Sequence, residues 1–331
     1  MKNKFQNRKI LVAGGTGLVG QQLTSQLVDL GADVYVCSLD NEEMAPQGIK
    51  DYYKLDMSVK ENCKKACDGK NIVFSLLGAT GSPVTNFKNP ATFMMGNLLT
   101  ALNMLEGARQ SNVEEYMYTS TYGVYSNKGE MIENKMWENN PSENDKFAGW
   151  AKRIGELQVE AYKKQYNWNK IYIVRPANIY GPFSNFDDKN SMVVASLIKK
   201  FCNNTGKVKI WGDGSPIRDF IYSKDVAIGM MRVMESGYNK PVNLGSGTGV
   251  TIKAIAETVA NLMPDTCEIV WDTSKPSGDK KRLMCTKRAE SLGIYATTDL
   301  NQGIKETIDW YNANNKKDFS RYNAFTDKTY V

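Results

Sequence analysis

The sequence predicts an α/β fold, with a doubly wound parallel sheet and a smaller, mixed α/β region in the C-terminal part of the chain. Three observations support this prediction. Short apolar segments, typical of buried parallel strands, alternate with helical segments through the first half of the 331 residues. A glycine-rich turn connects the first predicted strand to the first predicted helix. After Pro182 the alternation stops, and residues 183–190 are polar and typical of a loop.

The first half of the chain accounts for most of the main sheet. The pattern predicts strands near residues 10–13, 33–37, 51–55, 71–76, 115–119 and 170–175, and helices near residues 18–30, 59–68, 91–111 and 147–166. Strands that alternate with helices in this way form parallel sheets with right-handed crossovers and helices on both faces. We therefore expect a layered domain of the Rossmann type.

The second half is expected to divide between that domain and a smaller region. The pattern predicts helices near residues 191–203, 223–236, 251–263 and 300–314, a strand at 208–211, and a strand at 241–244 that rejoins the main sheet. Residues 315–331 are polar and are expected to be irregular. We predict one domain of residues 1–182 with about 223–246, and a second, substrate-binding region of residues 183–222 and 247–331.

The composition is that of an ordinary globular protein, with 41% hydrophobic and 24% charged residues. No apolar run reaches the ~18 residues that a membrane-spanning helix needs, and residues 1–9 form no apolar signal core. We therefore expect a cytoplasmic protein without a membrane partner. The net charge of +6 is spread along the chain, which suits an anionic small substrate and gives no support for nucleic-acid binding.

The chain contains no histidine, and none of its six cysteines forms a C-x-x-C motif. The lack of histidine excludes a histidine general base and the usual zinc sites, so no metal is expected. Six scattered cysteines in a chain of this length do not indicate a disulfide framework.

The most informative segment is residues 9–20, which read KILVAGGTGLVG. Its glycines have G-x-x-G-x-x-G spacing between a strand and a helix, which is the context of a dinucleotide site. Glycines let the diphosphate approach backbone amides at the helix N-terminus, where the helix dipole favours negative charge. An ordinary tight turn between strand and helix is the alternative. We expect cofactor contacts from Gly14, Thr16, Gly17, Leu18 and Val19.

The end of the second predicted strand indicates which dinucleotide binds. Asp40 lies about 20 positions past the turn, where an acidic residue binds the hydroxyls of the adenosine ribose. Ser38 is the alternative for the last position of the strand. No arginine occurs between Arg8 and Arg109, so a 2′-phosphate would meet negative charge without a guanidinium partner. NAD is therefore favoured over NADP.

Further motifs resemble the extended short-chain dehydrogenase/reductase family, also called the NAD-dependent epimerase/dehydratase family. They are YKLD at 53–56, SLLGA at 75–79, GNLL at 96–99, STYGVY at 120–125 and RPANIYGP at 175–182. Their order and spacing cover nearly the whole chain. The resemblance implies further cofactor contacts from Asp56, Met57, Leu76, Leu77, Gly78, Asn97, Thr119, Lys152, Pro176 and Asn178.

The pair of catalytic residues that defines this family is incomplete. The family has Tyr-x-x-x-Lys on a helix, where the lysine favours the phenolate and the tyrosine exchanges a proton with the substrate. Lys152 matches the lysine, but Ala148 stands where the family has tyrosine. Either the tyrosine has been removed by engineering, or Thr121, Lys152 and trapped water manage the proton, or the site only binds ligand. The resemblance makes Thr121 and Lys152 the catalytic candidates.

The second half of the chain resembles enzymes of the GDP-fucose synthase type within this family. The segments are WGDG with RDFIY at 211–222 and DTSKPSGDKKRLM at 272–284. The resemblance implies a GDP-sugar of manno type, bound by Thr121, Tyr122, Asn178, Val193, Lys209, Trp211, Arg218, Lys275 and Arg282. Two departures matter: Gly123 and Phe183 replace the cysteine and histidine that such enzymes use to invert sugar carbons 3 and 5.

The resemblance therefore implies a nicotinamide-dependent oxidoreductase that acts at carbon 4 of the sugar, a 6-deoxyhexose or heptose, for surface-polysaccharide synthesis. A 4-epimerase without net redox change and a non-catalytic nucleotide-sugar or NADH sensor are the alternatives. It also implies a homodimer in which helices 91–111 and 147–166 pair across a two-fold axis. Apolar residues suited to that interface, unless they face their own sheet, are Leu98, Leu102, Leu105, Leu157 and Ala161.

Overall fold

The computed structural model describes residues 3–79, 81, 83–188, 190–204, 206–265, 267–275, 278–315, 321–324 and 327. At its centre lies a seven-stranded sheet in the order β10-β6-β5-β4-β1-β2-β3, and all neighbouring strands are parallel. The strands are β1 (Lys9–Ala13), β2 (Asp33–Ser38), β3 (Asp51–Lys54), β4 (Ile72–Ser75), β5 (Glu115–Thr119), β6 (Ile171–Pro176) and β10 (Val242–Leu244). The doubly wound α/β fold is confirmed, and the strand at 241–244 rejoins the sheet as expected.

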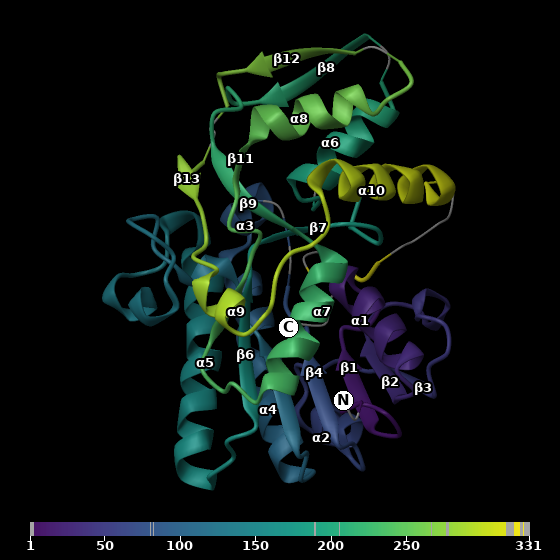
Figure 1. Ribbon diagram of the computed structural model, residues 1–331, viewed down its shortest axis with the longest axis vertical. Helices are drawn as coiled ribbons and strands as arrows, with labels where there is room; N and C mark the ends of the chain where they lie inside the picture. Colours follow the sequence, from purple (N-terminus) through teal and green to yellow (C-terminus); the bar gives the residue numbers. More distant parts are fainter. Residues whose placement is uncertain are drawn as a thin grey trace.

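Helices cover both faces of this sheet (Figure 1). Helices α1 (Leu18–Asp29) and α7 (Ser223–Ser236) pack on one face, and α2 (Lys60–Cys67), α4 (Pro90–Gln110) and α5 (Lys146–Tyr166) pack on the other. Within β1, Ile10 and Val12 belong to the first core cluster, whereas Leu11 and Ala13 belong to the second. A strand that is apolar on both faces explains the unbroken apolar run in the sequence.

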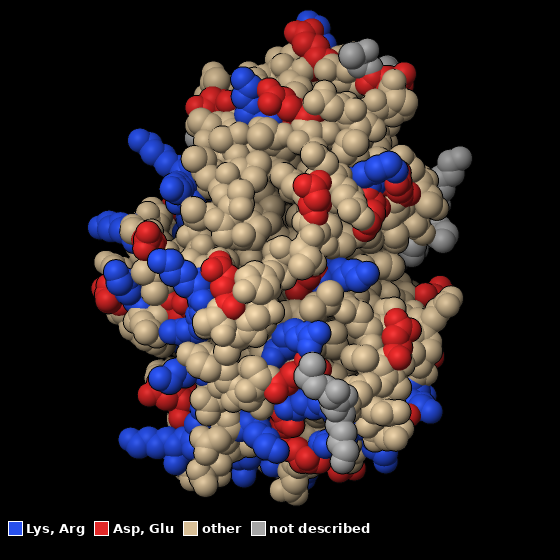
Figure 2. Space-filling model, viewed as in Figure 1, with Lys and Arg blue, Asp and Glu red and all other residues tan. Residues whose placement is uncertain are grey.

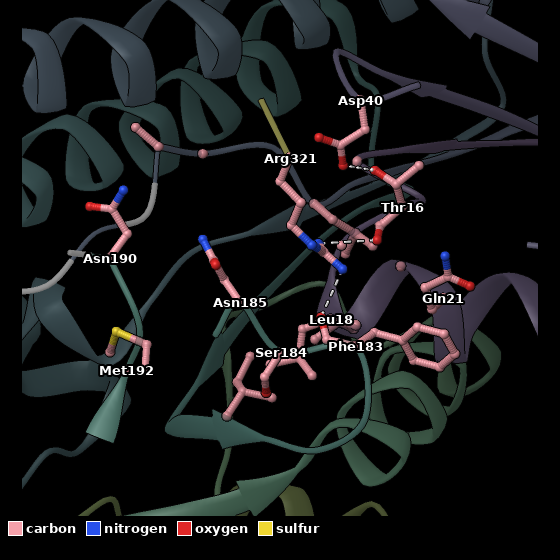
Figure 3. Close-up of a pocket in the computed structure, with 18 of the residues that line it drawn as sticks. Thr16, Leu18, Gln21, Asp40, Phe183, Ser184, Asn185, Asn190, Met192 and Arg321 are labelled. Carbon is pink, nitrogen blue, oxygen red and sulfur yellow. Dashed lines mark hydrogen bonds between the residues drawn. The ribbon is translucent and has the colours of Figure 1, made fainter. Parts of the chain in front are cut away.

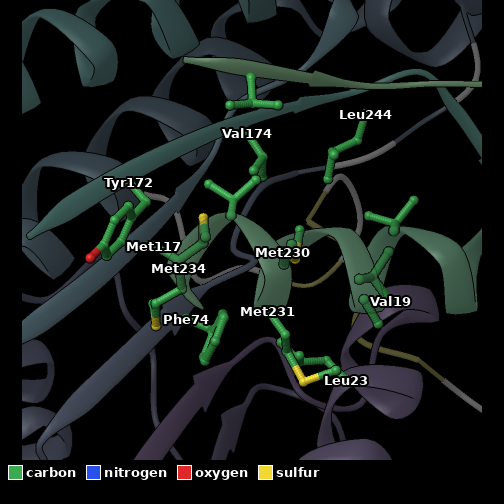
Figure 4. Packing of buried hydrophobic residues seen from close by; sticks show 14 of the residues in the cluster. Val19, Leu23, Phe74, Met117, Tyr172, Val174, Met230, Met231, Met234 and Leu244 are labelled. Atoms are coloured by element: carbon green, nitrogen blue, oxygen red, sulfur yellow. The ribbon is translucent and has the colours of Figure 1, made fainter. Parts of the chain in front are cut away.

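The core under α1 and α7 is packed with large apolar side chains (Figure 4). Val19 and Leu23 from α1, Met230 and Met234 from α7 and Phe74 from β4 belong to one core cluster, and all five side chains are buried. Burial of this kind removes about 25 cal/mol of unfavourable hydration per Å² of apolar surface. It fixes α1, and with it the glycine-rich turn, against the sheet.

Most of the remaining elements stand beyond the carboxyl ends of the sheet strands (Figure 1). They build a third core cluster, which includes Ile198, Phe201, Phe220 and Val259. Their strands are β7 (Asn178–Tyr180), β8 (Gly206–Trp211), β9 (Ile217–Tyr222), β11 (Gly249–Thr251), β12 (Cys267–Asp272) and β13 (Lys281–Arg282). Their helices are α6 (Val193–Cys202), α8 (Ile252–Asn261) and α10 (Leu300–Asn314).

Several elements lie outside the predicted pattern. The sequence pattern assigned no residue ranges to β7, β9, β11, β12 and β13. It also missed α3 (Pro83–Lys88), α9 (Lys287–Ser291) and the 3₁₀ turns η1 (Glu42–Met44), η2 (Tyr122–Val124), η3 (Glu133–Glu138) and η4 (Glu143–Asp145). Helix α9 contacts β10, and Ala289 joins the core of the main sheet, although the predicted boundary placed it in the second region.

Acidic and basic side chains are interspersed on the face shown in Figure 2, and they gather on its lower half, over the main domain. Within the described ranges, no helix combines the length and the apolar character that crossing a membrane requires. Pro276 and Ser277 of the DTSKPSG motif lie outside the described residues, as do residues 316–320 and 328–331 of the tail.

Candidate functional site

The glycine-rich turn has the conformation that its sequence requires. Gly14 has φ +84°, which side chains with a Cβ rarely adopt. A Cβ at Gly20 would lie 2.2 Å from the carbonyl oxygen of Gly14, so only glycine lets α1 approach the turn this closely. Gly17 is the N-cap of α1, and its amide donates to the Gly14 carbonyl at 3.1 Å. The turn thus aims the N-terminus of α1 at the space above the sheet.

Asp40 is fixed beside this turn by hydrogen bonds. Its Oδ2 accepts a hydrogen bond from Thr16 Oγ1 at 2.7 Å, and Thr16 Oγ1 also lies 2.7 Å from Ser38 Oγ. Its Oδ1 accepts a hydrogen bond from the backbone amide of Tyr322 at 2.8 Å. Ser38 is the last residue of β2, as the alternative had it, and both Ser38 and Asp40 line the cavity described next.

A cavity of about 1540 Å³ separates the carboxyl edge of the sheet from the second region. It is large enough for a dinucleotide and a further ligand, since drug-sized ligands occupy ≈ 300–1,000 Å³. Every predicted cofactor contact except Asp56 lies on its wall: Gly14, Thr16, Gly17, Leu18, Val19, Asp40, Met57, Leu76, Leu77, Gly78, Asn97, Thr119, Lys152, Pro176 and Asn178. The Asp56 carboxylate accepts a hydrogen bond from the Ser58 amide at 2.8 Å, so its side chain organises the start of α2.

Lys152 lies on α5 with its ammonium group buried at the floor of the cavity. Its Nζ donates to the carbonyl oxygens of Leu77 at 2.8 Å and Thr119 at 3.0 Å, at the ends of β4 and β5. Burial lowers the pKa of Lys152 to about 8, and the charge of Glu156 partly opposes that shift. Lys152 can therefore lose its proton close to neutral pH.

Thr121 and Ala148 lie on the cavity wall with Lys152. Thr121 caps η2, and its Oγ1 accepts a hydrogen bond from the Gly123 amide at 3.2 Å. Ala148 lies one turn before Lys152 on α5, so the phenol of the family's tyrosine is replaced by open space.

The neighbouring phenol does not replace the missing one. Tyr122 lines the cavity, and burial raises its pKa to about 12, so it stays protonated near neutral pH. Its ring lies 5.2 Å from the guanidinium carbon of Arg282. The pKa of Lys152, about 8, lies nearer to neutrality than that of Tyr122.

Sequence reasoning missed one carboxylate at this end of the cavity. Asp145, at the N-cap of α5, lies on the wall, and a Cβ at Gly123 would sit 3.4 Å from its side chain. Burial raises the pKa of Asp145, while the guanidinium of Arg282, at 3.2 Å, opposes that shift. In the sequence, this residue could have been found from its position, three residues before Ala148.

Six of the predicted substrate contacts lie away from the cavity wall: Val193, Lys209, Trp211, Arg218, Lys275 and Arg282. Arg218 donates to the carbonyl oxygen of Asp279 at 2.6 Å, and Arg282 is 2% exposed and pairs with Asp145 and Asp279. Lys275 lies 5.9 Å from the ring of Trp211 at the outer β8–β12 ribbon. Substrate contact by these residues stays a prediction, whereas Thr121, Tyr122 and Asn178 do line the cavity.

Phe183 and Asn178, in the second half of the chain, make contacts that hold the fold together. Phe183, where a histidine was expected by resemblance, has φ +67°, and its ring packs 5.0 Å from that of Trp310. Asn178 donates from its amide nitrogen to the Asp219 carbonyl oxygen at 2.9 Å and so ties β7 to β9. Neither contact supplies a proton donor to the cavity.

Sequence reasoning also missed the C-terminal segment. Residues 321–324, which we call the C-terminal strap, line the cavity beside the glycine-rich turn (Figure 3). Arg321 donates to the carbonyl oxygens of Thr16 at 3.3 Å and Phe183 at 2.9 Å. No local pattern in the polar tail signals this return to a site formed some 300 positions earlier.

Comparisons with known proteins show the family of the chain. Residues 10–245 match the sequence profile described as the NAD dependent epimerase/dehydratase family. The chain is 30% identical over 316 residues to the "Putative GDP-L-fucose synthase 2" of Arabidopsis thaliana, and the alignment covers 92% of each protein.

Solved structures that share the fold include two enzymes whose names refer to nucleotide sugars. UDP-glucose 4-epimerase of Thermotoga maritima, solved with UDP-glucose, superposes with a TM-score of 0.81 at 25% identity and covers 92% of this chain and 99% of its own. A GDP-L-fucose synthetase from Naegleria fowleri, solved with NADP, gives a TM-score of 0.77 over 94% of this chain and 96% of its own. At 23% identity the second likeness concerns the fold alone.

Proposed function

Because the chain belongs to the NAD dependent epimerase/dehydratase family, we propose that it oxidises or reduces carbon 4 of a GDP-linked manno-type sugar with a bound nicotinamide cofactor. The observation that carries this proposal is the cavity, which joins a glycine-rich dinucleotide turn to Thr121 and Lys152. The similarity to a GDP-L-fucose synthase over 92% of the chain supports the sugar and the nucleotide. We place the reaction in cytoplasmic surface-polysaccharide synthesis, with a 6-deoxyhexose or heptose as the sugar.

The roles of the residues follow from their positions. With cofactor and sugar bound, Lys152 would hold the nicotinamide ribose, and Thr121 would bind the oxygen of the reacting carbon. When bound, the cofactor accepts or supplies the hydride, and the chain has to move one proton from or to the sugar hydroxyl. Thr121 relays that proton, and Lys152 accepts it when its amine is neutral.

The missing cysteine and histidine limit the reaction. Inversion at carbons 3 and 5 requires an acid and a base on opposite sides of the sugar ring, but Gly123 and Phe183 supply neither. A 4-epimerase remains the second candidate, favoured by the 25% identity to UDP-glucose 4-epimerase. NAD is proposed over NADP because Asp40 faces the place of the adenosine ribose, where a 2′-phosphate would meet its negative charge.

The experiment is incubation of the purified protein with a panel of GDP-manno-sugars, with UDP-glucose as the control sugar. A dehydrogenase changes the near-ultraviolet absorbance of the cofactor and yields a product 2 mass units lighter, since two hydrogens leave the sugar (~2 Da). Proton NMR separates the candidates, because a retained keto group excludes simple epimerisation. Binding without turnover for every sugar, also in Ala148→Tyr, would support a sensor and overturn the proposal.

Ala148→Tyr tests the space left by the missing phenol. We expect a rate of hydride transfer at least equal to that of the parent, because the new phenol lies one turn from Lys152 and can exchange the proton directly. Single-turnover absorbance with saturating cofactor and GDP-sugar measures this rate. Ala148→Phe, which fills the same space without a hydroxyl, is expected to be slower than Ala148→Tyr. A large fall in Ala148→Tyr with cofactor still bound would show that substrate or ordered water needs the space.

We also propose a homodimer formed by α4 and α5 across a two-fold axis. Leu157 is 53% exposed and Met95 is 42% exposed, so apolar surface is available on both helices. Leu105, in contrast, is 1% exposed in the single chain and packs in its own core, so it is withdrawn from the predicted interface. Light scattering at micromolar concentration is expected to give twice the chain mass, and Leu157→Arg to shift it toward the monomer. A monomer-sized parent protein would refute the dimer.

A further inference from the structure

The C-terminal strap crosses the mouth of the cofactor half of the cavity. Helix α10 ends at Asn314, and the chain returns at residues 321–324 beside the glycine-rich turn. Figure 3 shows Arg321 between Thr16 and Phe183, with Asp40 above. Together with the Tyr322 amide on Asp40, these hydrogen bonds attach the strap to both sides of the cavity. The strap is thus held where the cofactor is expected, not on the outer surface.

Arg321 is poorly neutralised in this position. A guanidinium has five N–H donors, and the two hydrogen bonds of Arg321 end on uncharged carbonyl oxygens. Among the residues that the structure describes, no carboxylate lies within ion-pair distance of it. Burial lowers its pKa, while the more distant charge of Asp40 favours the cation. A desolvated cation is costly unless an anion approaches it.

We propose that Arg321 binds the diphosphate of the nicotinamide cofactor, so that the C-terminal strap forms part of the cofactor site; this rests on the proposed function. The guanidinium is held at the carbonyl of Thr16, inside the turn where the family motif places the diphosphate. The carbonyls of Thr16 and Phe183 orient its plane, and its remaining donors suit two phosphate oxygens. A 2′-phosphate is the weaker candidate, because it would approach the Asp40 carboxylate.

The assignment gives the cofactor site an arginine from a distant part of the chain. No arginine lies between Arg8 and Arg109, yet the fold brings one from position 321 to the first turn of the sheet.

The test measures the dissociation constants of NADH and NADPH by calorimetry on protein freed of cofactor. Arg321→Gln is expected to weaken both about 10-fold to 100-fold, the range for loss of a hydrogen bond to a charged group. The affinity for ADP-ribose, which keeps the diphosphate, should fall by the same factor. Adenosine should bind the variant as tightly as it binds the parent. Arg232→Gln is the matched control, because Arg232 is an exposed arginine on α7 paired with Glu235. Thermal melting without cofactor checks that each variant is folded.

Each other outcome overturns the assignment. Unchanged binding of NADH and NADPH would show that the strap lines the cavity without binding the cofactor. Tighter binding would make it a competitor of the cofactor through the Tyr322 amide on Asp40. Weakening confined to NADPH would place a 2′-phosphate at Arg321. If the parent protein binds neither NADH nor NADPH, the proposed function fails together with the inference; in the other cases only the inference fails.

Discussion

Lys152→Met is expected to lower the rate of hydride transfer about 10³-fold, within the range for the loss of a general base. With alanine at position 148, no phenolate exists to take the proton of the sugar hydroxyl, and Tyr122 keeps its own proton. Thr121 is too weak a base near pH 7 to do more than relay the proton. Thr121→Ala should therefore lower the rate of hydride transfer about 10²-fold. Lys152 meets both requirements of a base at this site. It lies on the cavity wall, and its pKa is about 8.

The pH dependence follows from the same amine. The pKa of Lys152 is lowered by burial, so the neutral amine that can accept a proton becomes more abundant as pH rises through about 8. A neutral amine still has two N–H groups for the carbonyls of Leu77 and Thr119 and keeps a lone pair for the proton. We therefore expect the oxidative rate to rise toward a plateau above pH 8, and Lys152→Met to lose this dependence.

The control for this variant lies on the same helix. Burial also lowers the pKa of Lys163 to about 8, but its Nζ donates to the Asn239 carbonyl and the residue is not on the cavity wall. Lys163→Met should therefore keep the parent rate and pH profile. A parent rate that does not vary with pH, or a Lys152→Met variant within tenfold of the parent, would contradict the role given to Lys152. If Asp145→Asn lost the rate of hydride transfer instead, the Asp145 carboxylate would be the group that accepts the proton.

Those parts of the site that depend on short-range sequence were predictable. The turn at Gly14–Gly20, Asp40 two residues past the end of β2 and the i, i+4 relation of Ala148 and Lys152 each need only a strand or a helix in the expected place. Periodicity supplies that information, because burial of one helix stripe or of both strand faces dictates it. Helices α7 and α10 were predicted to the residue for the same reason.

The parts that were missed depend on contacts between distant segments. Arg321 reaches Thr16 through a tail with no apolar pattern, so no local signal predicts it. Arg218 and Arg282 belong to recognisable motifs, but Arg218 donates to Asp279 of the other motif, and Arg282 pairs with Asp145 before α5 as well as with Asp279 of its own motif. The motifs identified the residues, whereas the carboxylates and carbonyls around them decide whether a guanidinium is free for a ligand.

One such long-range contact supports the catalytic strand ends. Glu156 on α5 and Arg175 on β6 form a two-fold hydrogen-bonded ion pair at 2.9 and 2.6 Å, and both side chains are buried. Ser120, the residue before Thr121, donates its hydroxyl to the same carboxylate at 2.5 Å. The pair therefore joins the helix of Lys152 to the segment that carries Thr121. Its charges were taken out of water on folding, so each depends on the other.

Glu156→Leu is expected to lower the free energy of unfolding by about 3–5 kcal/mol, the cost of leaving one buried charge without its partner. Arg175 would keep its bonds to Tyr125 and the Glu133 carbonyl, which are neutral and do not balance the guanidinium. Urea unfolding followed by fluorescence measures the change. Glu160→Leu, at an exposed position one turn further along α5, should stay within about 0.5 kcal/mol of the parent.

The double variant Glu156→Leu/Arg175→Met separates the ion pair from simple loss of packing. Replacing both charges with apolar side chains of similar volume removes the unpaired guanidinium, so the double variant should be more stable than Glu156→Leu alone. It should also shift the rise of the oxidative rate to lower pH, because the charge of Glu156 helps to keep Lys152 protonated. A double variant as unstable as the sum of its single changes would show that the two charges act independently, and the proposed link between α5 and Thr121 would then fail.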